Sequence, residues 1–386
     1  MNEAEIVFPN EPVSWTDTDK ESVRRLFVWI AENKGNDVNI SSGSKVSMQK
    51  DGKIKRVTRK ILNDDDVKNI LFVIFESEAA RADLLSGKDR DFAYSVKSKD
   101  GKRFRFRVNA TAILSRDSSG IQITARTINS IPPRVTDFNV DQEILDNYMR
   151  DEGMVVFAGS TGTGKSTLMA SIIRQILETP DSHKKIITYE APIEFVYEDV
   201  ISESSIIFQT EVYRQLPNFS SAVRNALRRA PDIILIGEAR DAETIEQSII
   251  ASQSGHLLFT TTHTNGVSET IKRMVNEFSK EDRNSRALDL ISAMNMIVSQ
   301  KLVYKVGGGR VALREYLVFT NEIKQKLQTV DVDNLSYHVR QLLKKHGQTF
   351  FMDAKKKYEE NLIDLETLKR LEYLDTAEDR DHKAEN

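Results

Sequence analysis

The chain has 386 residues, of which 39% are hydrophobic and 29% charged, and its formal net charge is −3. This composition is typical of a soluble globular protein of two domains and excludes a disordered chain, while the slight negative charge argues against a nucleic-acid footprint over the whole molecule. The absence of cysteine excludes disulfide scaffolds, thiolate nucleophiles and zinc sites with cysteine ligands.

The N-terminal stretch MNEAEIVFPNEP is acidic and lacks an apolar core of the signal-peptide type. No run approaches the roughly 18 apolar residues of a membrane span. We therefore expect a cytoplasmic protein, with docking onto a membrane machine left open.

Residues 1–130 are predicted to form a first domain of short strands and helices. Strand patterns occupy 37–43, 46–58 and 104–114, with Asp-Gly turns between them, and residues 64–77 predict a helix that begins with three aspartates. The two prolines of IPPRV stop any helix, so we expect a linker over 131–136.

Residues 137–330 are predicted to form a second domain of alternating strands and amphipathic helices. This alternation predicts a mostly parallel sheet covered on both faces, with strands at 154–158, 185–190, 232–238, 256–261 and 314–319. The remaining residues, 331–386, are predicted to be a helical tail. It contains one helix at 335–347 and a longer helix running through Leu362, Leu365, Leu368 and Leu371. Because 351–386 carry 11 acidic and 7 basic side chains, we expect a solvated or docking segment.

The stretch GSTGTGKST, 159–167, follows an apolar strand and precedes a helix, which is the context of a phosphate-binding P-loop. Backbone N–H groups and the helix N-terminus would hold the phosphates of ATP. Lys165 is expected to reach the β- and γ-phosphates, and Ser166 is expected to offer its hydroxyl to Mg²⁺. The predicted nucleotide-binding residues are Ser160, Thr161, Gly162, Thr163, Gly164, Lys165, Ser166 and Thr167.

The stretch IILIGEARD, 233–241, ends a buried strand with Gly237 where P-loop hydrolases usually carry a magnesium-binding aspartate. Glu238 follows, and Glu190 ends another predicted strand. Because ligands of such sheets bind beyond the carboxyl ends of the strands, both carboxylates are expected at the site. We expect the strand of Glu238 to lie beside the P-loop, so that Glu238 orients the attacking water while Glu190 acts on magnesium through water. Each remains, alternatively, a solvated strand-end charge. Asp241 is expected to cap the next helix.

Two histidines bracket one predicted strand. Seven residues of strand separate His256 from His263 by roughly 23 Å, which excludes a shared metal ion. His263 lies at the carboxyl end and is a candidate for contacting the γ-phosphate. Packing or capping is the alternative for both residues, and more so for His256.

The segment KRFRFRVNA, 102–110, places Arg103, Arg105 and Arg107 on one face of a strand and Phe104 and Phe106 on the other. Its alternation favours core phenylalanines over the stacking platform of a single-strand binder. The arginines, with Arg126 on a later strand, are candidate arginine fingers, or else a solvated basic face.

Four of these stretches, GSTGTGKST, ITYEAPIEF, VRNALRRAPDIILIGEARD and SGHLLFTTTHTNG, resemble the Walker A, Asp, Walker B and His boxes of the type II/type IV secretion ATPase family, which includes the pilus retraction motor PilT. DVNISSG, DRDFAYSV and FRFRVNA resemble the family's PAS-like N-terminal domain. QKLV (300–303) and GQTFFMDA (347–354) resemble its C-terminal part, so the resemblance covers about residues 20–375. Within the family, TYEAPIEFVY, GEARDAETI and VALREYLVF are most similar to DotB and TraJ, the ATPases of type IVB secretion and conjugation.

The resemblance implies a PAS-like α+β domain, a RecA-like P-loop ATPase domain and a helical tail. It implies a homohexameric ring that uses ATP and Mg²⁺ and docks, from the cytoplasm, on an inner-membrane secretion or conjugation channel, without sequence-specific nucleic-acid binding. Glu238 matches the Walker B glutamate, Glu190 the Asp-box glutamate and His263 the second His-box histidine. Arg107 and Arg126 match N-terminal arginines that approach the phosphates, which we expect to act within their own chain. The family often has a second acid after Glu190, but this chain has Ala191.

Three other functions are alternatives to this one. A pilus retraction motor uses the same chemistry with another partner. A P-loop kinase needs an acceptor pocket and a lid, which no segment predicts. A nucleic-acid translocase is disfavoured by the net charge.

Overall fold

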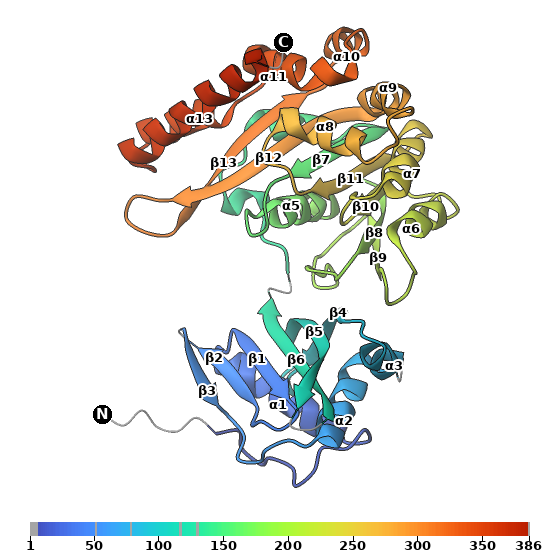
Figure 1. The fold of residues 1–386 in the computed structure, drawn as a ribbon, viewed down its shortest axis with the longest axis vertical. Helices are drawn as coiled ribbons and strands as arrows, with labels where there is room; N and C mark the ends of the chain where they lie inside the picture. Colours follow the sequence, from blue (N-terminus) through green and yellow to red (C-terminus); the bar gives the residue numbers. More distant parts are fainter. Residues whose placement is uncertain (1–6, 51, 78, 116–117, 129–130, 385–386) are drawn as a thin grey trace. The chain divides into compact units, whose positions relative to one another are not determined.

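The structure is a computed structural model that describes residues 7–50, 52–77, 79–115, 118–128 and 131–384. The chain divides into two compact units (Figure 1). The first comprises Met1–Ile131 together with Ala191–Val196, and the second comprises Pro132–Glu190 together with Tyr197–Asn386. Each unit has its own sheet and its own hydrophobic core.

The first unit contains a six-stranded sheet of order β3-β2-β1-β6-β5-β4, in which every neighbouring pair is antiparallel. Helices pack against it, and Phe27 of the first helix meets Phe106 of β5 edge-to-face at 4.9 Å. The strand pattern predicted at 46–58 is present as the antiparallel strands β2 and β3, and the predicted core role of Phe104 and Phe106 is confirmed. The elements are α1 (Lys20–Glu32), β1 (Asp37–Ser41), β2 (Ser47–Lys50), β3 (Lys53–Arg56), α2 (Asp64–Phe75), α3 (Ala79–Leu85), β4 (Arg90–Lys97), β5 (Arg103–Ser115) and β6 (Ser118–Ile128).

The N-terminus of α2 shows why this helix begins where the sequence predicts. Asn63 accepts a hydrogen bond from the Asp66 backbone N–H at 2.8 Å, and Asp66 accepts one from the Asn63 N–H at 3.0 Å. This reciprocal capping box satisfies N–H groups that have no partner inside the helix. Asp66 also accepts from the Trp15 N–H and from Lys60, so the cap joins three parts of the unit.

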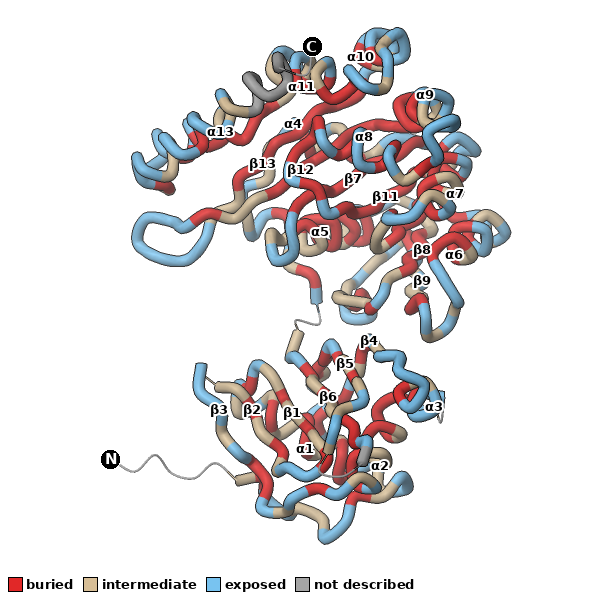
Figure 2. The backbone as a smooth tube through the Cα atoms, in the orientation of Figure 1, coloured by how far each residue is buried: buried red, intermediate tan, exposed pale blue. Residues whose placement is uncertain are grey.

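The second unit contains a seven-stranded sheet of order β13-β12-β7-β11-β10-β8-β9, parallel except for the antiparallel pair β12 and β13. Its central strands β7, β10 and β11 are buried along their whole length (Figure 2). The strands are β7 (Gly153–Ala158), β8 (Lys185–Glu190), β9 (Ile206–Glu211), β10 (Ile233–Ile236), β11 (Leu257–Thr262), β12 (Met294–Tyr304) and β13 (Arg310–Val318). The helices are α4 (Gln142–Asn147), α5 (Lys165–Glu178), α6 (Phe219–Ala226), α7 (Ala242–Gln253), α8 (Val267–Asn276), α9 (Arg283–Ala293), α10 (Asn321–Gln328), α11 (Leu335–His346), α12 (Phe350–Glu359) and α13 (Leu365–Ala384), with short 3-10 helices at Val135–Asp137 and Val332–Asn334.

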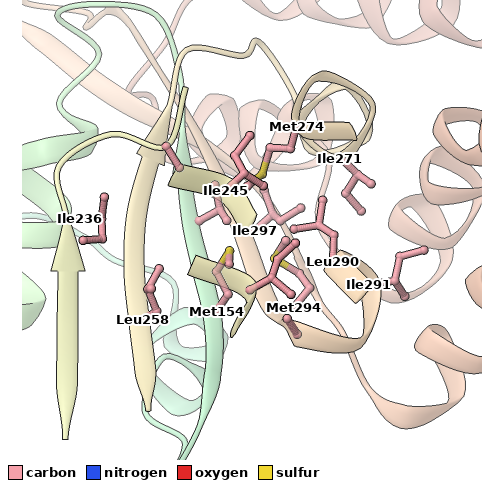
Figure 3. Close-up of a cluster of buried hydrophobic side chains, with 14 of the residues drawn as sticks. Met154, Ile236, Ile245, Leu258, Ile271, Met274, Leu290, Ile291, Met294 and Ile297 are labelled. Carbon is pink, nitrogen blue, oxygen red and sulfur yellow. The ribbon is translucent and has the colours of Figure 1, made fainter. Parts of the chain in front are cut away.

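The core of the second unit lies between the sheet and helices α7, α8 and α9 (Figure 3). The cluster brings together Met154 of β7, Leu258 of β11 and Ile297 of β12 with Ile245 of α7 and Leu290 of α9. The mostly parallel sheet was predicted correctly, but β9 and β12 were missed. The sequence of β12 follows α9 with no turn residue between them, and β9 alternates between exposed and partly buried positions.

The C-terminal helices are partly buried, whereas residues 351–386 were expected to form a solvated or docking segment. Helix α11 contributes Leu335, Val339 and Leu343 to the main core. The predicted helix through Leu362 is broken, because α12 ends at Glu359 and Asn361 adopts a left-handed φ of 58° before Asp364 caps α13. A separate apolar cluster joins β12 and β13 to the C-terminal helices α12 and α13 and consists of Val303, Leu313, Phe350, Ala354, Ile363 and Leu371. Over the described residues, no helix has the length and apolar character needed to cross a bilayer.

Candidate active site

The P-loop occupies the turn between β7 and α5. Gly164 is the N-cap of α5, with a φ of 83°, and Lys165 is the first residue of the helix. Inside the turn, the Thr163 hydroxyl donates to the Ser160 carbonyl at 2.9 Å, and the Lys165 ammonium lies 3.4 Å from the same carbonyl. The loop therefore curls around its own lysine. This arrangement presents the N-terminal N–H groups of α5 and a cation to the same spot, which is a site for anionic phosphate.

Four sequence-predicted side chains lie at one edge of the sheet of the second unit. The strands β7, β11, β10 and β8 are neighbours in that order and run parallel. Lys165 follows β7, His263 follows β11, Glu238 follows β10, and Glu190 ends β8. The carboxyl ends of parallel strands meet at one edge, so the four residues form a row across it.

Three members of the row contact one another in succession. The Lys165 Nζ lies 3.4 Å from His263 Nδ1, and His263 Nε2 lies 3.7 Å from Glu238 Oε1. An ammonium group only donates, so Nδ1 accepts and the proton of a neutral imidazole lies on Nε2, facing the carboxylate. The structure therefore gathers the lysine, the histidine and Glu238, which the sequence placed at the site separately.

The expectation that the strand of Glu238 lies beside the P-loop is wrong. Strand β11 stands between β10 and β7. With strands spaced by about 4.8 Å, Glu238 begins about 10 Å from β7 and Glu190 about 14 Å. His263, from the intervening strand, fills the nearer position, and Glu238 remains closer than Glu190.

Glu190 has different surroundings from Glu238. Its Oε1 accepts hydrogen bonds from the Thr188 hydroxyl at 2.8 Å and from the Gln209 amide at 3.3 Å. These contacts fix the carboxylate at the end of β8. A small cavity of about 50 Å³ lies instead beside Glu238 and His263, lined also by Arg240, Thr262 and Arg273. It is large enough for a water molecule.

The donor set suits magnesium that arrives with a nucleotide. Ser166 lies partly buried in the first turn of α5, next to Lys165. Among the residues that the structure describes, no group of three or more acidic or histidine side chains is arranged to hold a metal ion by itself. Mg²⁺ usually takes only one or two protein ligands and fills its other positions with phosphate and water. One hydroxyl, with two carboxylates farther along the same sheet edge that can act through water, fits that requirement.

The first unit places Arg107 and Arg126 directly opposite each other on the adjacent strands β5 and β6. Arg126 is exposed and donates to Asp37 at 2.7 Å, and this hydrogen bond raises the pKa of the guanidinium. Arg107 lies 3.8 Å from Glu194. Two like charges side by side repel, so the two acids offset a local cost.

Arg105 corrects the expectation of a solvated basic face or a finger. Its side chain is only 2% exposed. The guanidinium donates to the carbonyl oxygens of Ile193 and Glu194, each at 2.7 Å, and to the Ser95 hydroxyl at 3.2 Å. It thus holds the 191–196 segment, which belongs to the same unit.

Two smaller expectations are confirmed. Asp241 caps α7 by accepting from the Thr244 N–H at 2.8 Å. His256 sits at the opposite end of β11 from His263, and its Nδ1 lies 3.2 Å from the Ala251 carbonyl and 3.3 Å from the Ser254 hydroxyl. His256 therefore contacts the C-terminal end of α7 and lies away from the sheet edge that carries the P-loop.

Two residues that contact the P-loop were missed from the sequence. The Ser160 hydroxyl donates to the Asn265 side chain at 2.9 Å, and the Gln300 amide donates to the Thr163 carbonyl at 2.7 Å. Both lie in stretches that resemble family motifs, THTN and QKLV. The motif marks them, but only the fold shows what they touch.

Known proteins are similar to this chain over most of its length. A family model described as "Type II/IV secretion system protein" matches residues 134–370. Among characterised proteins, the type IV pilus retraction ATPase PilT of Pseudomonas aeruginosa is 33% identical over 306 residues, which is 79% of this chain and 85% of that protein.

Solved structures give the same grouping. The chain is similar to the X-ray structure of the Legionella pneumophila ATPase DotB, with a TM-score of 0.89 and 39% identity over 95% of this chain and 98% of the other. It is also similar to the crystal structure of the pilus retraction motor PilT with bound ADP, with a TM-score of 0.75 and 30% identity over 90% of this chain and 96% of that one.

Proposed function

Because the chain belongs to the type II/IV secretion system protein family, we propose that it is a motor ATPase that hydrolyses ATP to power transfer through a type IV secretion or conjugation system of the IVB kind. The observation that carries the enzymatic part is the contact row Lys165, His263 and Glu238 beside a P-loop. This row places a cation, a hydrogen-bond donor and a carboxylate in line at the edge where phosphates bind.

Each member of the row has a role in phosphoryl transfer. Lys165 exchanges its contact with the Ser160 carbonyl for the β- and γ-phosphate oxygens. His263 then presents its Nε2 proton either to Glu238 or to the γ-phosphate, and so senses whether the phosphate is present. Glu238 accepts a hydrogen bond from the attacking water and so orients a lone pair of the water oxygen toward the phosphorus. We propose that the loop residues 160–167 bind ATP.

Magnesium, when bound with ATP, neutralises charge that builds up on the phosphate oxygens. Ser166 is proposed to hold it directly. Glu190, fixed by Thr188 and Gln209, is proposed to polarise water near it. Arg107 and Arg126 are proposed as the arginines that stabilise the transferring phosphoryl group, a role that requires each to exchange its carboxylate, Glu194 or Asp37, for phosphate.

We propose that the working form is a homohexameric ring in the cytoplasm, docked at the inner membrane on components of the channel. The identity of 39% with the DotB structure over almost the whole chain favours a IVB-type secretion or conjugation partner. The second candidate is a pilus retraction or assembly motor, favoured by the 33% identity with PilT. The two candidates share chemistry and differ in the membrane partner.

The experiment measures three properties of the purified protein. Phosphate release with Mg²⁺ and ATP tests hydrolysis, and light scattering with nucleotide tests the ring. Co-purification from the native membrane then separates channel components from pilus components. A monomer that releases no phosphate would sink the motor proposal, and recovery of pilus components alone would replace the channel by the pilus.

A further inference from the structure

Gln300 of β12 joins the P-loop to a buried arginine. Its side chain is 4% exposed. The amide Nε2 donates to the Thr163 carbonyl at 2.7 Å, and the amide Oε1 accepts from Arg314 Nε at 2.9 Å. The proposed function gives Gln300 no role, yet it is a buried polar group aimed at the phosphate-binding turn.

We propose that Gln300 is a positioning residue that holds the P-loop backbone in its phosphate-binding shape, with Arg314 fixing the direction of the Gln300 amide. This inference rests on the proposed function for its catalytic meaning. The claim that Gln300 fixes the backbone shape of residues 159–165 rests on the contacts alone.

The planarity of the peptide bond connects this hydrogen bond to the phosphate. In a trans peptide the C=O and the following N–H point in opposite directions. Gln300 holds the Thr163 carbonyl on the side of β12, so the Gly164 N–H must face the other side, into the turn. A P-loop binds phosphate through such inward N–H groups. Gln300 therefore sets the direction of a phosphate-binding donor without touching the nucleotide.

Two glycines allow β12 to approach the loop this closely. A Cβ at Gly159 would lie 2.6 Å from the Gln300 carbonyl oxygen, and a Cβ at Gly164 would lie 2.9 Å from Gln300 Nε2. A contact below 3.0 Å forces one of the two groups to shift, and the positive φ of 146° at Gly159 and 83° at Gly164 strains any other residue. Gln300 therefore meets both ends of the loop at positions that favour glycine. The motif glycines thus allow β12 to pack closely against the loop, in addition to allowing the loop to bind phosphate.

Arg314 prevents the amide from turning over. A guanidinium only donates hydrogen bonds, so it selects the oxygen end of Gln300 and leaves the nitrogen end for Thr163. Arg314 itself is 2% exposed and fixed from behind. Its backbone N–H donates to Asp353 of α12 at 2.7 Å, and its guanidinium donates to the Asn139 carbonyl. The C-terminal helix α12 therefore anchors the strand residue that orients Gln300.

The test is Gln300→Glu, compared with Asn295→Asp as a matched control. Glutamate has the shape of glutamine and keeps an acceptor for Arg314, but it places an oxygen against the Thr163 carbonyl. Asn295 lies on the same strand, is also 4% exposed, and donates to the Glu152 carbonyl at 2.6 Å, at the opposite end of β7. Both variants remove one buried amide donor, but only one does so at the P-loop.

Three measurements are made on each full-length variant: amide hydrogen exchange of residues 159–165 without nucleotide, the Kd of a fluorescent ATP analogue with Mg²⁺, and the thermal midpoint. Gln300→Glu is expected to speed exchange in the loop and weaken nucleotide binding at least tenfold. Asn295→Asp is expected to leave the loop exchange and the nucleotide Kd unchanged within twofold, even if its thermal midpoint falls as far as that of Gln300→Glu. Unchanged loop exchange in Gln300→Glu, or equal effects in both variants, overturns the inference.

Failure of the proposed function gives a different result. If the unmodified protein and Lys165→Ala both fail to bind the analogue, the ATPase proposal falls, while loop exchange still decides the role of Gln300. Should Gln300→Glu not fold, Gln300→Asn replaces it, because the shorter side chain withdraws the same amide from Thr163. The same loop-exchange criterion then applies.

Discussion

Replacing Glu238 by glutamine is expected to leave Mg-ATP binding within about fivefold and to slow turnover by roughly 10²–10⁴, the usual contribution of a positioned base. The swap keeps the size of the side chain and one hydrogen-bond acceptor. What it removes is the negative charge beside His263, and with it the basicity that lets the carboxylate orient and activate water.

The structure separates the effect on binding from the effect on rate. The Glu238 carboxylate lies 3.7 Å from His263 Nε2 and is 28% exposed. At such a partly solvated site, removing one charge next to a neutral imidazole costs about 1 kcal/mol or less. A loss of 10²–10⁴ in rate corresponds to about 3–5 kcal/mol in the barrier. The rate effect should therefore exceed the binding effect clearly.

Glu190→Gln is the internal comparison. The hydrogen bonds that Glu190 accepts from Thr188 and Gln209 both end on Oε1, and glutamine can keep an acceptor there. Its strand lies about 14 Å from β7, so we expect less than about a tenfold loss of turnover. The assay is phosphate release at saturating ATP, with binding measured separately. A turnover of Glu238→Gln within threefold of normal, together with a hundredfold loss in Glu190→Gln, would refute the assignment and exchange the two roles.

Three further changes have defined outcomes. Lys165→Ala should weaken Mg-ATP binding by at least about tenfold, because it deletes a charged donor to the phosphates; unchanged affinity in a binding titration would count against the P-loop. Burial alone would raise the pKa of Asp66, but Lys60 and the N–H groups of Trp15 and Asn63 outweigh it and hold the pKa below its usual 3.8. The stability that the ionised Asp66 carboxylate gives is therefore present above about pH 4 and lost as pH falls through the lowered pKa. Asp66→Asn should lower the free energy of unfolding by about 1–3 kcal/mol at pH 7 and flatten its dependence on acid pH, both measured by tryptophan fluorescence in urea. An unaltered pH profile would contradict this. Leu258→Ala should destabilise the second unit by about 2–5 kcal/mol in thermal unfolding, whereas Leu288→Ala, 42% exposed, should cost under about 0.5 kcal/mol; equal losses would argue against the core position of Leu258.

The sequence predicted those parts of the site that depend on neighbours along the chain. GSTGTGKST contains its own strand exit, turn and helix start, so the loop could be placed without tertiary information. Parallel strands meet at one edge, so His263 and Glu238 could be assigned to that edge together. The order of strands within the sheet is a tertiary property, and for that reason β11 was not expected between β10 and β7.

Contacts over long sequence distances explain the other differences. Alternation along β5 correctly put Arg105 opposite the phenylalanines, but the carbonyls that cover it come from residues 88 and 89 positions away. Gln300 meets Thr163 over 137 positions. The amide of a glutamine inside an apolar strand carries no local signal of its partner.

The six-residue excursion of the chain into the first unit affects how the protein can be dissected. Residues 191–196 come from the middle of the chain, directly after β8, and supply two of the carbonyl acceptors of Arg105. A fragment that ends at residue 131 would keep the sheet of the first unit but lose these acceptors from a buried guanidinium, at about 1.5–3 kcal/mol each. Two fragments divided at the proline linker would thus carry pieces of one folding unit in separate molecules. We expect them to be stable when mixed and less stable apart, which makes the linker a poor place to cut and a useful place to test complementation.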